Sequence, residues 1–184
     1  MKPIIFSTPM VQAILDGKKT QTRRVIKIDD APENWKISIA GTSIVRTEPY
    51  DVKLPRYAAG DILWVRETWS KDENGEYVYR ANYGTTEDDS FPPSMFKWKP
   101  SIHMPREAAR IFLEVKNVRV ERIKEISNED ILAEGINDLG SYGANYDYFA
   151  NEIWDSINGK KYPWKNNPWV WVYEFGRIDN YGKN

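Results

Sequence analysis

The sequence predicts an α+β fold: a small β-barrel of about six strands, flanked by short helices and carrying loop insertions. Strand and helix signals follow one another without the β-α-β rhythm of a doubly wound parallel sheet. Within 110–122 the apolar residues change from odd to even positions near Lys116, which predicts a β-bulge or bend of the kind that barrel strands need. Residues 168–175 are almost wholly apolar, as in a strand buried on both faces.

The N-terminal part predicts a strand, a helix and a second strand. Residues 4–6 are a short apolar strand, and Ser-Thr-Pro then offers an N-cap and a first-turn proline for a helix over 8–16. The apolar residues of this helix form one stripe, and Gly17 is placed to end it. Residues 20–28, rich in β-branched side chains, form the next predicted strand.

The middle of the chain predicts a hairpin and two elaborations. Residues 61–69 alternate partly in hydrophobicity, and an Asn-Gly turn leads from them to a strand at 76–82. The polar stretch at about 28–58 and the turn-rich stretch at about 71–97 read as elaborations on one core domain.

The C-terminal part completes this domain. A serine N-cap opens a helix over 128–134 that Gly135 ends, and a second helix is predicted over 146–157. The single domain is expected to span 1–178, with a tail at 179–184.

Composition excludes several kinds of chemistry. The 184 residues contain no Cys, which removes disulfide frameworks, thiolate zinc sites and Cys nucleophiles. His103 is the single histidine, so no His–His metal pair exists, and we predict neither a metal nor a cofactor. Without a long apolar run or a signal segment, the sequence predicts a cytoplasmic protein that does not contact membranes. The net charge of −1 excludes a globally basic nucleic-acid binder but permits a local basic patch.

The densest polar signal is the segment 17–24, which holds four cations and two hydroxyls directly after a helix. Such a density of ammonium and guanidinium groups suits a phosphate or a carboxylate, so Lys18, Arg23 and Arg24 are candidate phosphate contacts. A solvated, charged strand edge is the alternative. The glycine spacing of a Walker loop is missing.

The end of the strand at 61–69 offers a possible base-binding site. Glu67 and Trp69 share one face of the strand, and Arg66 lies on the other. A carboxylate beside an indole can hold a base by accepting its exocyclic amine while the ring stacks. A structural Glu–Arg pair beside a core tryptophan is the alternative.

Two further candidates are the segment around the single histidine and an acidic residue at a helix end. Two prolines fix the backbone around four polar residues that could converge on an anion: Lys99, Ser101, His103 and Arg106. An ordered connection with an ordinary histidine explains the same segment. Glu134 ends the helix over 128–134, where the helix dipole is expected to raise its pKa unless it is an ordinary surface glutamate.

Taken together, these segments resemble the activating-signal-cointegrator homology (ASCH) domains of the PUA-like superfamily. Residues 17–24 are similar to the basic signature of the family, 60–67 to its Gly-Asp-x-hydrophobic strand, and 126–136 to its D-x-x-x-E-G helix. The resemblance covers most of the chain outside 28–56 and 71–93. Two more segments, 99–110 and 154–159, resemble the phage and prophage branch often labelled morphogenetic.

The resemblance implies a small barrel with a cleft between barrel and helices, which in the wider superfamily binds RNA or a modified base. One compact branch is described as an amidohydrolase that removes the acyl group from N4-acylated cytidine with a Lys, a Thr and a Glu. These positions fall on Lys19, Thr22 and Glu134. Since Lys19 and Thr22 have opposite strand parity, their convergence requires Lys19 to lie in the turn after Gly17.

Three hypotheses follow. The first is a domain that binds RNA or a nucleotide in a basic cleft, with Arg66 and His103 among the contacts and Lys99, Ser101 and Arg106 at its rim. The second is an amide hydrolase acting on a modified nucleobase. The third is a phage assembly or interaction protein, which the branch label alone suggests.

Overall fold

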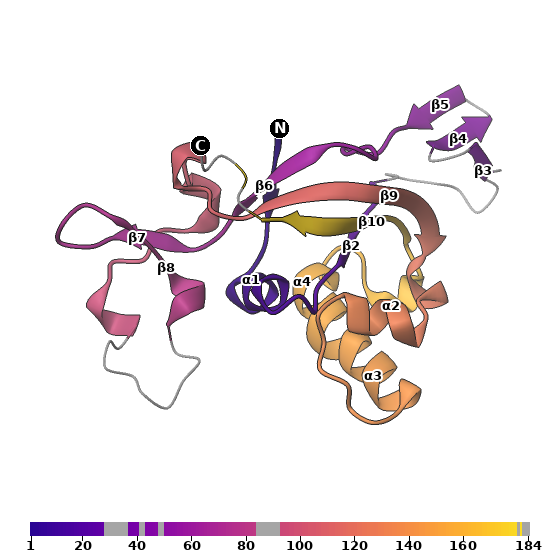
Figure 1. Cartoon of the computed structure of the whole chain (residues 1–184). Coiled ribbons are helices and arrows are strands. Elements are labelled where there is room, and N and C mark those ends of the chain that lie inside the picture. Colours follow the sequence, from indigo (N-terminus) through magenta and orange to yellow (C-terminus); the bar gives the residue numbers. More distant parts are fainter. Residues whose placement is uncertain (28–36, 41–42, 48–49, 84–92, 180, 182–184) are drawn as a thin grey trace.

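The computed structural model describes residues 1–27, 37–40, 43–47, 50–83, 93–179 and 181. Its centre is a mixed five-stranded sheet in the order β1-β6-β9-β10-β2 (Figure 1). These strands are β1 (Lys2–Ile5), β2 (Gln21–Val25), β6 (Ile62–Arg66), β9 (Phe112–Arg122) and β10 (Trp169–Ile178). β1 runs parallel to β6, and the other neighbours are antiparallel. The predicted α+β class is confirmed.

The sheet curls, but its two edge strands are not joined by a main-chain ladder in the part of the chain that the structure describes. The edges approach through a side chain: Arg24 of β2 donates from Nη2 to the carbonyl of Ile5 at 3.0 Å, and its guanidinium lies 5.5 Å from the Phe6 ring centre. The sheet has five strands because the predicted strand at 76–82 pairs with residues 69–71 in a separate two-stranded sheet.

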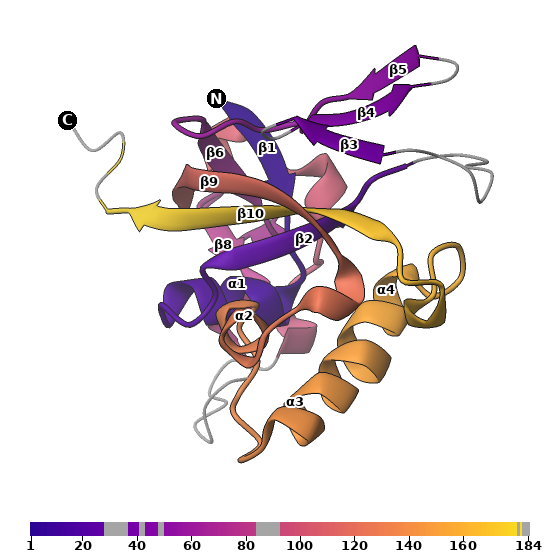
Figure 2. The same ribbon diagram turned by 90° about the vertical axis from the view of Figure 1, so that its right-hand side faces the viewer.

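The helices lie below the sheet in the views of Figures 1 and 2. They are α1 (Thr8–Leu15), α2 (Asn128–Ala133), α3 (Tyr142–Tyr148) and α4 (Ser156–Asn158), and a π-helical stretch, Phe149–Asp155, joins the last two. Short 3₁₀ turns lie at Arg80–Asn82, Pro93–Met95, Ser101–His103, Arg106–Ala108, Ile123–Glu125 and Trp164–Asn166. The last long helix begins earlier than predicted because Ser141 caps it: its Oγ accepts from the Ala144 N–H at 3.2 Å.

The two predicted elaborations carry small sheets of their own. β3 (Ile37–Ala40), β4 (Ser43–Thr47) and β5 (Tyr50–Lys53) form an antiparallel sheet at the opposite side from the helices (Figure 1). β7 (Trp69–Lys71) pairs with β8 (Tyr77–Tyr79) across the predicted Asn-Gly turn, where Gly75 has φ +82°. The hairpin is confirmed, but its first strand is separate from β6.

The long strands carry the predicted irregularity and the predicted double burial. Asn117 of β9 pairs with Glu174, whereas Val115 pairs with Phe175, so Lys116 is the extra residue of the bulge. The side chains of β10 alternate between two apolar clusters. Trp171, Tyr173 and Phe175 pack with β1, β6 and α1, while Val170 and Val172 pack on the opposite face of β10 against α2, α3 and the π-helical stretch. An apolar run is therefore required there.

Candidate active site

The site is built around a buried ion pair between Lys19 and Glu134. Gly17, with φ +74°, ends α1 and turns the chain, and the backbone of Lys19 then forms an isolated antiparallel bridge with Glu134. Lys19 Nζ donates to Glu134 Oε2 at 2.6 Å and to the Glu134 carbonyl at 2.8 Å. The two residues are only 2% and 8% exposed. Lys19 lies between the turn at Gly17 and the start of β2, in this bridge and not in the turn itself as the sequence predicts.

Burial and neighbouring charges act on both partners. Burial lowers the pKa of Lys19, and the cations Arg24 and Arg23 lower it further, while Glu134 opposes them. Burial by itself would raise the pKa of Glu134, but Lys19 and Arg23 outweigh it and the pKa is lowered. The rise expected from the helix dipole is wrong because two cations contact this carboxylate. Lys19 therefore gives up its proton more readily than an ordinary lysine.

Arg23, predicted as a phosphate contact, instead forms ion pairs within the protein. Its side chain is buried and donates to three carboxylates, which are Glu121 at 2.7 Å, Asp130 at 2.9 Å and Glu134 at 3.1 Å. Lys18 is also misplaced by the sequence prediction, because it is half exposed and donates to Asn137 Oδ1 at 3.1 Å. Arg23 borders the small cavity with its charge already paired, and Lys18 does not line that cavity.

A small cavity of about 60 Å³ adjoins the ion pair. Thr22, which is 1% exposed, lines it together with Arg23, Arg24 and Glu134. Apolar side chains form a large part of the remaining wall: Met10, Phe149, Ile153, Trp154 and Ile157. The volume suits a few water molecules or a group of similar size.

Arg24 is the least compensated cation of the site. Burial lowers its pKa, and no carboxylate of the described residues lies within ion-pair distance of it. Its charge is therefore available to a ligand or to negative charge that develops during a reaction.

A larger groove of about 460 Å³ adjoins the small cavity, and Arg24, Val25 and Asn158 border both. The rest of its lining combines cations with aromatic rings: Lys27, Leu54, Arg56, Tyr57, Tyr162, Trp171 and Tyr173. Sequence reasoning missed this groove. Arg56 and Tyr57 lie in a polar stretch with no distinguishing local motif.

Glu67 has a structural role. Its two carboxylate oxygens accept from Nε and Nη2 of Arg110, both at 2.9 Å, and the residue is 1% exposed. A carboxylate saturated by a bidentate arginine has little capacity left for the amine of a base. The predicted base-binding role is wrong, and the alternative of a structural Glu–Arg pair is correct.

The side chains of Trp69 and Arg66 likewise contact other residues of the protein. The indole is buried, its ring centre lies 5.6 Å from that of Tyr77, and Lys99 Nζ covers it at 4.7 Å. Arg66 donates to the Ile102 carbonyl. Trp69 Nε1 and Arg66 Nε are buried with no hydrogen-bond partner among the described residues. A base cannot stack on a ring covered in this way.

The predicted rim residues lie beside this second cluster rather than around the cleft. Lys99 bridges to Trp69 of β7, and Ser101 and His103 form a 3₁₀ turn. Arg106 is exposed and reaches Met1 Sδ at 3.5 Å. None of these residues lines the small cavity or the groove. The structure thus brings together positions 19, 22, 23, 24 and 134, and separates the others from them.

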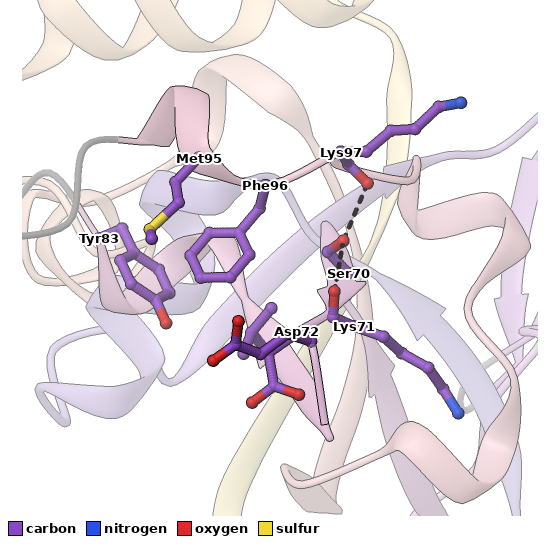
Figure 3. A pocket seen from close by; sticks show the side chains of 9 residues that line it. Ser70, Lys71, Asp72, Tyr83, Met95, Phe96 and Lys97 are labelled. Atoms are coloured by element: carbon purple, nitrogen blue, oxygen red, sulfur yellow. Dashed lines mark hydrogen bonds between the residues drawn. The ribbon is translucent and has the colours of Figure 1, made fainter. Parts of the chain in front are cut away.

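Another hollow, of about 440 Å³, lies at the β7–β8 hairpin. Figure 3 shows Tyr83 and Phe96 at one side of it and Asp72 at another, with the Ser70 hydroxyl donating to the Lys97 carbonyl at 2.9 Å. None of the residues predicted from the sequence to form a site lines it. We assign it no function.

Comparisons with known proteins show no family. No family model and no curated protein matches the chain. Among solved structures, the chain is similar to protein EF3133 from Enterococcus faecalis V583, which carries the family designation DUF984. The identity is 12%, the TM-score is 0.45, and the alignment covers 94% of this chain and 68% of that one.

Two properties of the described residues bear on metals and membranes. No group of three His, Asp or Glu side chains is arranged to hold a metal ion within the described ranges. None of the helices in that part of the chain has the length and apolar character needed to cross a membrane.

Acid is expected to weaken the network around Arg23. Burial opposes ionisation of Asp130, but a hydrogen bond from Gln21 and two arginine cations outweigh it and lower the pKa of Asp130. A carboxyl with a depressed folded-state pKa contributes stability above its unfolded pKa of about 4, and this is lost as the pH falls toward the folded value. We expect the free energy of unfolding, measured with urea between pH 6 and about 2.5, to decrease less with falling pH in Asp130→Asn than in the parent protein. The exposed Glu129→Gln control should keep the parent slope, and an equal change in both variants would contradict the assignment.

Proposed function

We propose that this protein is an amide hydrolase that removes an acyl group from an N4-acylated cytidine-type base. The observation that carries the proposal is the buried 2.6 Å contact between Lys19 and Glu134, beside a cavity that Thr22 lines. The resemblance to ASCH domains supports the same three residues. In this proposal the chain is a member of that family, and the approach of β1 to β2 through Arg24 corresponds to the seam of its PUA-like barrel.

The reaction uses Thr22 as nucleophile and Lys19 as base. The Lys19 ammonium first releases a proton to solvent, which its lowered pKa favours. Neutral Lys19 then takes the Thr22 hydroxyl proton as the oxygen bonds to the acyl carbon; the carbon–N4 bond breaks, and Lys19 returns that proton to the departing amine. Water hydrolyses the acyl-threonine ester: its oxygen bonds to the acyl carbon, the ester bond breaks, and a carboxylic acid and free Thr22 result. Glu134 positions Lys19, and Arg24 stabilises the oxyanion.

The test is the release of cytidine from N4-acetylcytidine, followed by chromatography. Thr22→Val keeps the shape of the side chain without its hydroxyl, so turnover should fall at least about 100-fold, as should that of Lys19→Met. Thr22→Ser is the matched control and should retain measurable turnover. Wild-type turnover in a Thr22→Val protein that unfolds at the parent temperature would exclude Thr22 as nucleophile.

Binding of RNA or a nucleotide without turnover is the second candidate. Three cations along the groove favour it: Arg24, Lys27 and Arg56. A Thr22→Val protein that binds cytidine compounds as well as the parent, combined with no turnover by either protein, would select this candidate.

A further inference from the structure

We propose that the groove beside the small cavity is a phosphate-binding subsite, so that the ligand of this site is a nucleotide rather than a free nucleoside. The inference deepens the proposed function and rests on it for the orientation of the ligand, with the acyl end of the base toward Thr22. The existence of the subsite is argued from the groove alone.

Charge is the first argument. Arg24, Lys27 and Arg56 line the groove, and no acidic residue is among the described residues that line it. Among the described residues, no carboxylate lies within ion-pair distance of these three cations. Arg23, the residue before Arg24, is by contrast paired with three carboxylates. Uncompensated cations that converge on one hollow attract a multivalent anion, and phosphate accepts several charge-assisted hydrogen bonds.

The aromatic residues are the second argument. Tyr57, Tyr162, Trp171 and Tyr173 form the apolar part of the lining. Burial raises the pKa of Tyr173, so its hydroxyl stays protonated, and that oxygen accepts from the Arg56 N–H at 3.1 Å. The Tyr162 hydroxyl is buried and has no hydrogen-bond partner among the described residues. A surface that combines apolar rings with cations suits a ligand with a flat base or sugar at one end and a charge at the other.

The arrangement of the two hollows is the third argument. Arg24 borders both, so one ligand can span them. The smaller hollow, about 60 Å³, has room for an acyl group but not for a base, while the groove of about 460 Å³ has the size of an ordinary small-molecule site. With the acyl group in the small cavity, the remainder of the ligand extends toward Lys27 and Arg56.

The experiment measures binding, so it does not depend on turnover. The dissociation constants of cytidine and cytidine 5′-monophosphate are determined by calorimetry with the Thr22→Val protein at two salt concentrations. We expect the monophosphate to bind roughly 10- to 100-fold more tightly than cytidine, with the advantage decreasing at high salt. In the added double substitution Lys27→Gln/Arg56→Gln, the advantage should fall to about threefold or less. The control Arg106→Gln/Lys116→Gln changes the net charge equally at exposed positions outside the groove and should keep the advantage.

A short cytidine oligonucleotide distinguishes the two sources of phosphate. Tighter binding of the oligonucleotide than of the monophosphate identifies a nucleotide within RNA, and weaker binding identifies a free nucleotide; both support the subsite. Equal affinities of the parent for cytidine and its monophosphate would overturn it, as would an advantage that survives the groove substitutions or is lost in the control. If phosphate selectivity is observed but N4-acetylcytidine is not hydrolysed, the proposed reaction fails and the subsite stands.

Discussion

Replacing Glu134 by glutamine is expected to lower the free energy of unfolding by about 3–5 kcal/mol, because it leaves buried cations without their shared counter-charge. Lys19 Nζ lies 2.6 Å from one carboxylate oxygen of Glu134, and Arg23 Nη1 lies 3.1 Å from the other. Both cationic side chains are buried, so water cannot replace the lost charge. Urea unfolding at pH 7 measures the change.

Two controls separate this mechanism from a general effect of losing a carboxylate. Glu114 pairs with Lys116 at the surface, so Glu114→Gln should change the free energy of unfolding by less than about 1 kcal/mol. In a Lys19→Met background, Glu134→Gln should be less costly because one stranded cation is absent. The same cost in both backgrounds would show that the Lys19 contact does not cause the loss.

Replacing Gly135 by alanine should cost about 2–5 kcal/mol, since two separate penalties combine. Gly135 has φ +90°, where a Cβ is disfavoured by about 1–2 kcal/mol. The new Cβ would also lie 2.7 Å from the Cβ of Ala13 and 2.9 Å from that of Lys19, and overpacking typically adds about 1–3 kcal/mol. Thermal and urea unfolding measure the loss. Displacement of Lys19 should also reduce turnover of N4-acetylcytidine.

Gly75→Ala is the matched control for this prediction. Gly75 has φ +82°, yet nothing lies within 4 Å of the position of its added Cβ. It therefore carries only the backbone penalty of about 1–2 kcal/mol. If the two variants lose the same free energy of unfolding, the close approach of Gly135 to Ala13 and Lys19 does not contribute to the loss.

Features of the fold that depend on short-range interactions were predictable from the residues. Gly17 ends α1 in the left-handed conformation, the Asn-Gly sequence turns a hairpin, and the change of phase at Lys116 marks the bulge in β9. Each depends on backbone sterics or on alternation within a few neighbouring positions. By contrast, the main sheet has five strands among the described residues, because the predicted strand at 76–82 pairs with its sequence neighbour β7 in a separate sheet and does not join the main one.

The candidate site shows the same division. The residue types of the basic segment and its position after a helix limited the chemistry to Lys, Thr, Glu and Arg, since the chain has no Cys and one His. Which of these cations is free for a ligand was decided by partners far along the chain. Arg23 meets Glu121 98 residues away, and Glu67 meets Arg110 43 residues away, so both are occupied.

Arg24, beside Arg23 in sequence, lies on the opposite face of β2 and meets a backbone carbonyl in place of a carboxylate. Composition and local pattern therefore determined which chemistry is available to this protein and where its turns fall. Tertiary structure alone selected the residues that remain available to a ligand. Whether a cation is neutralised depends on the carboxylates that lie near it in space, and local sequence does not encode which residues those are.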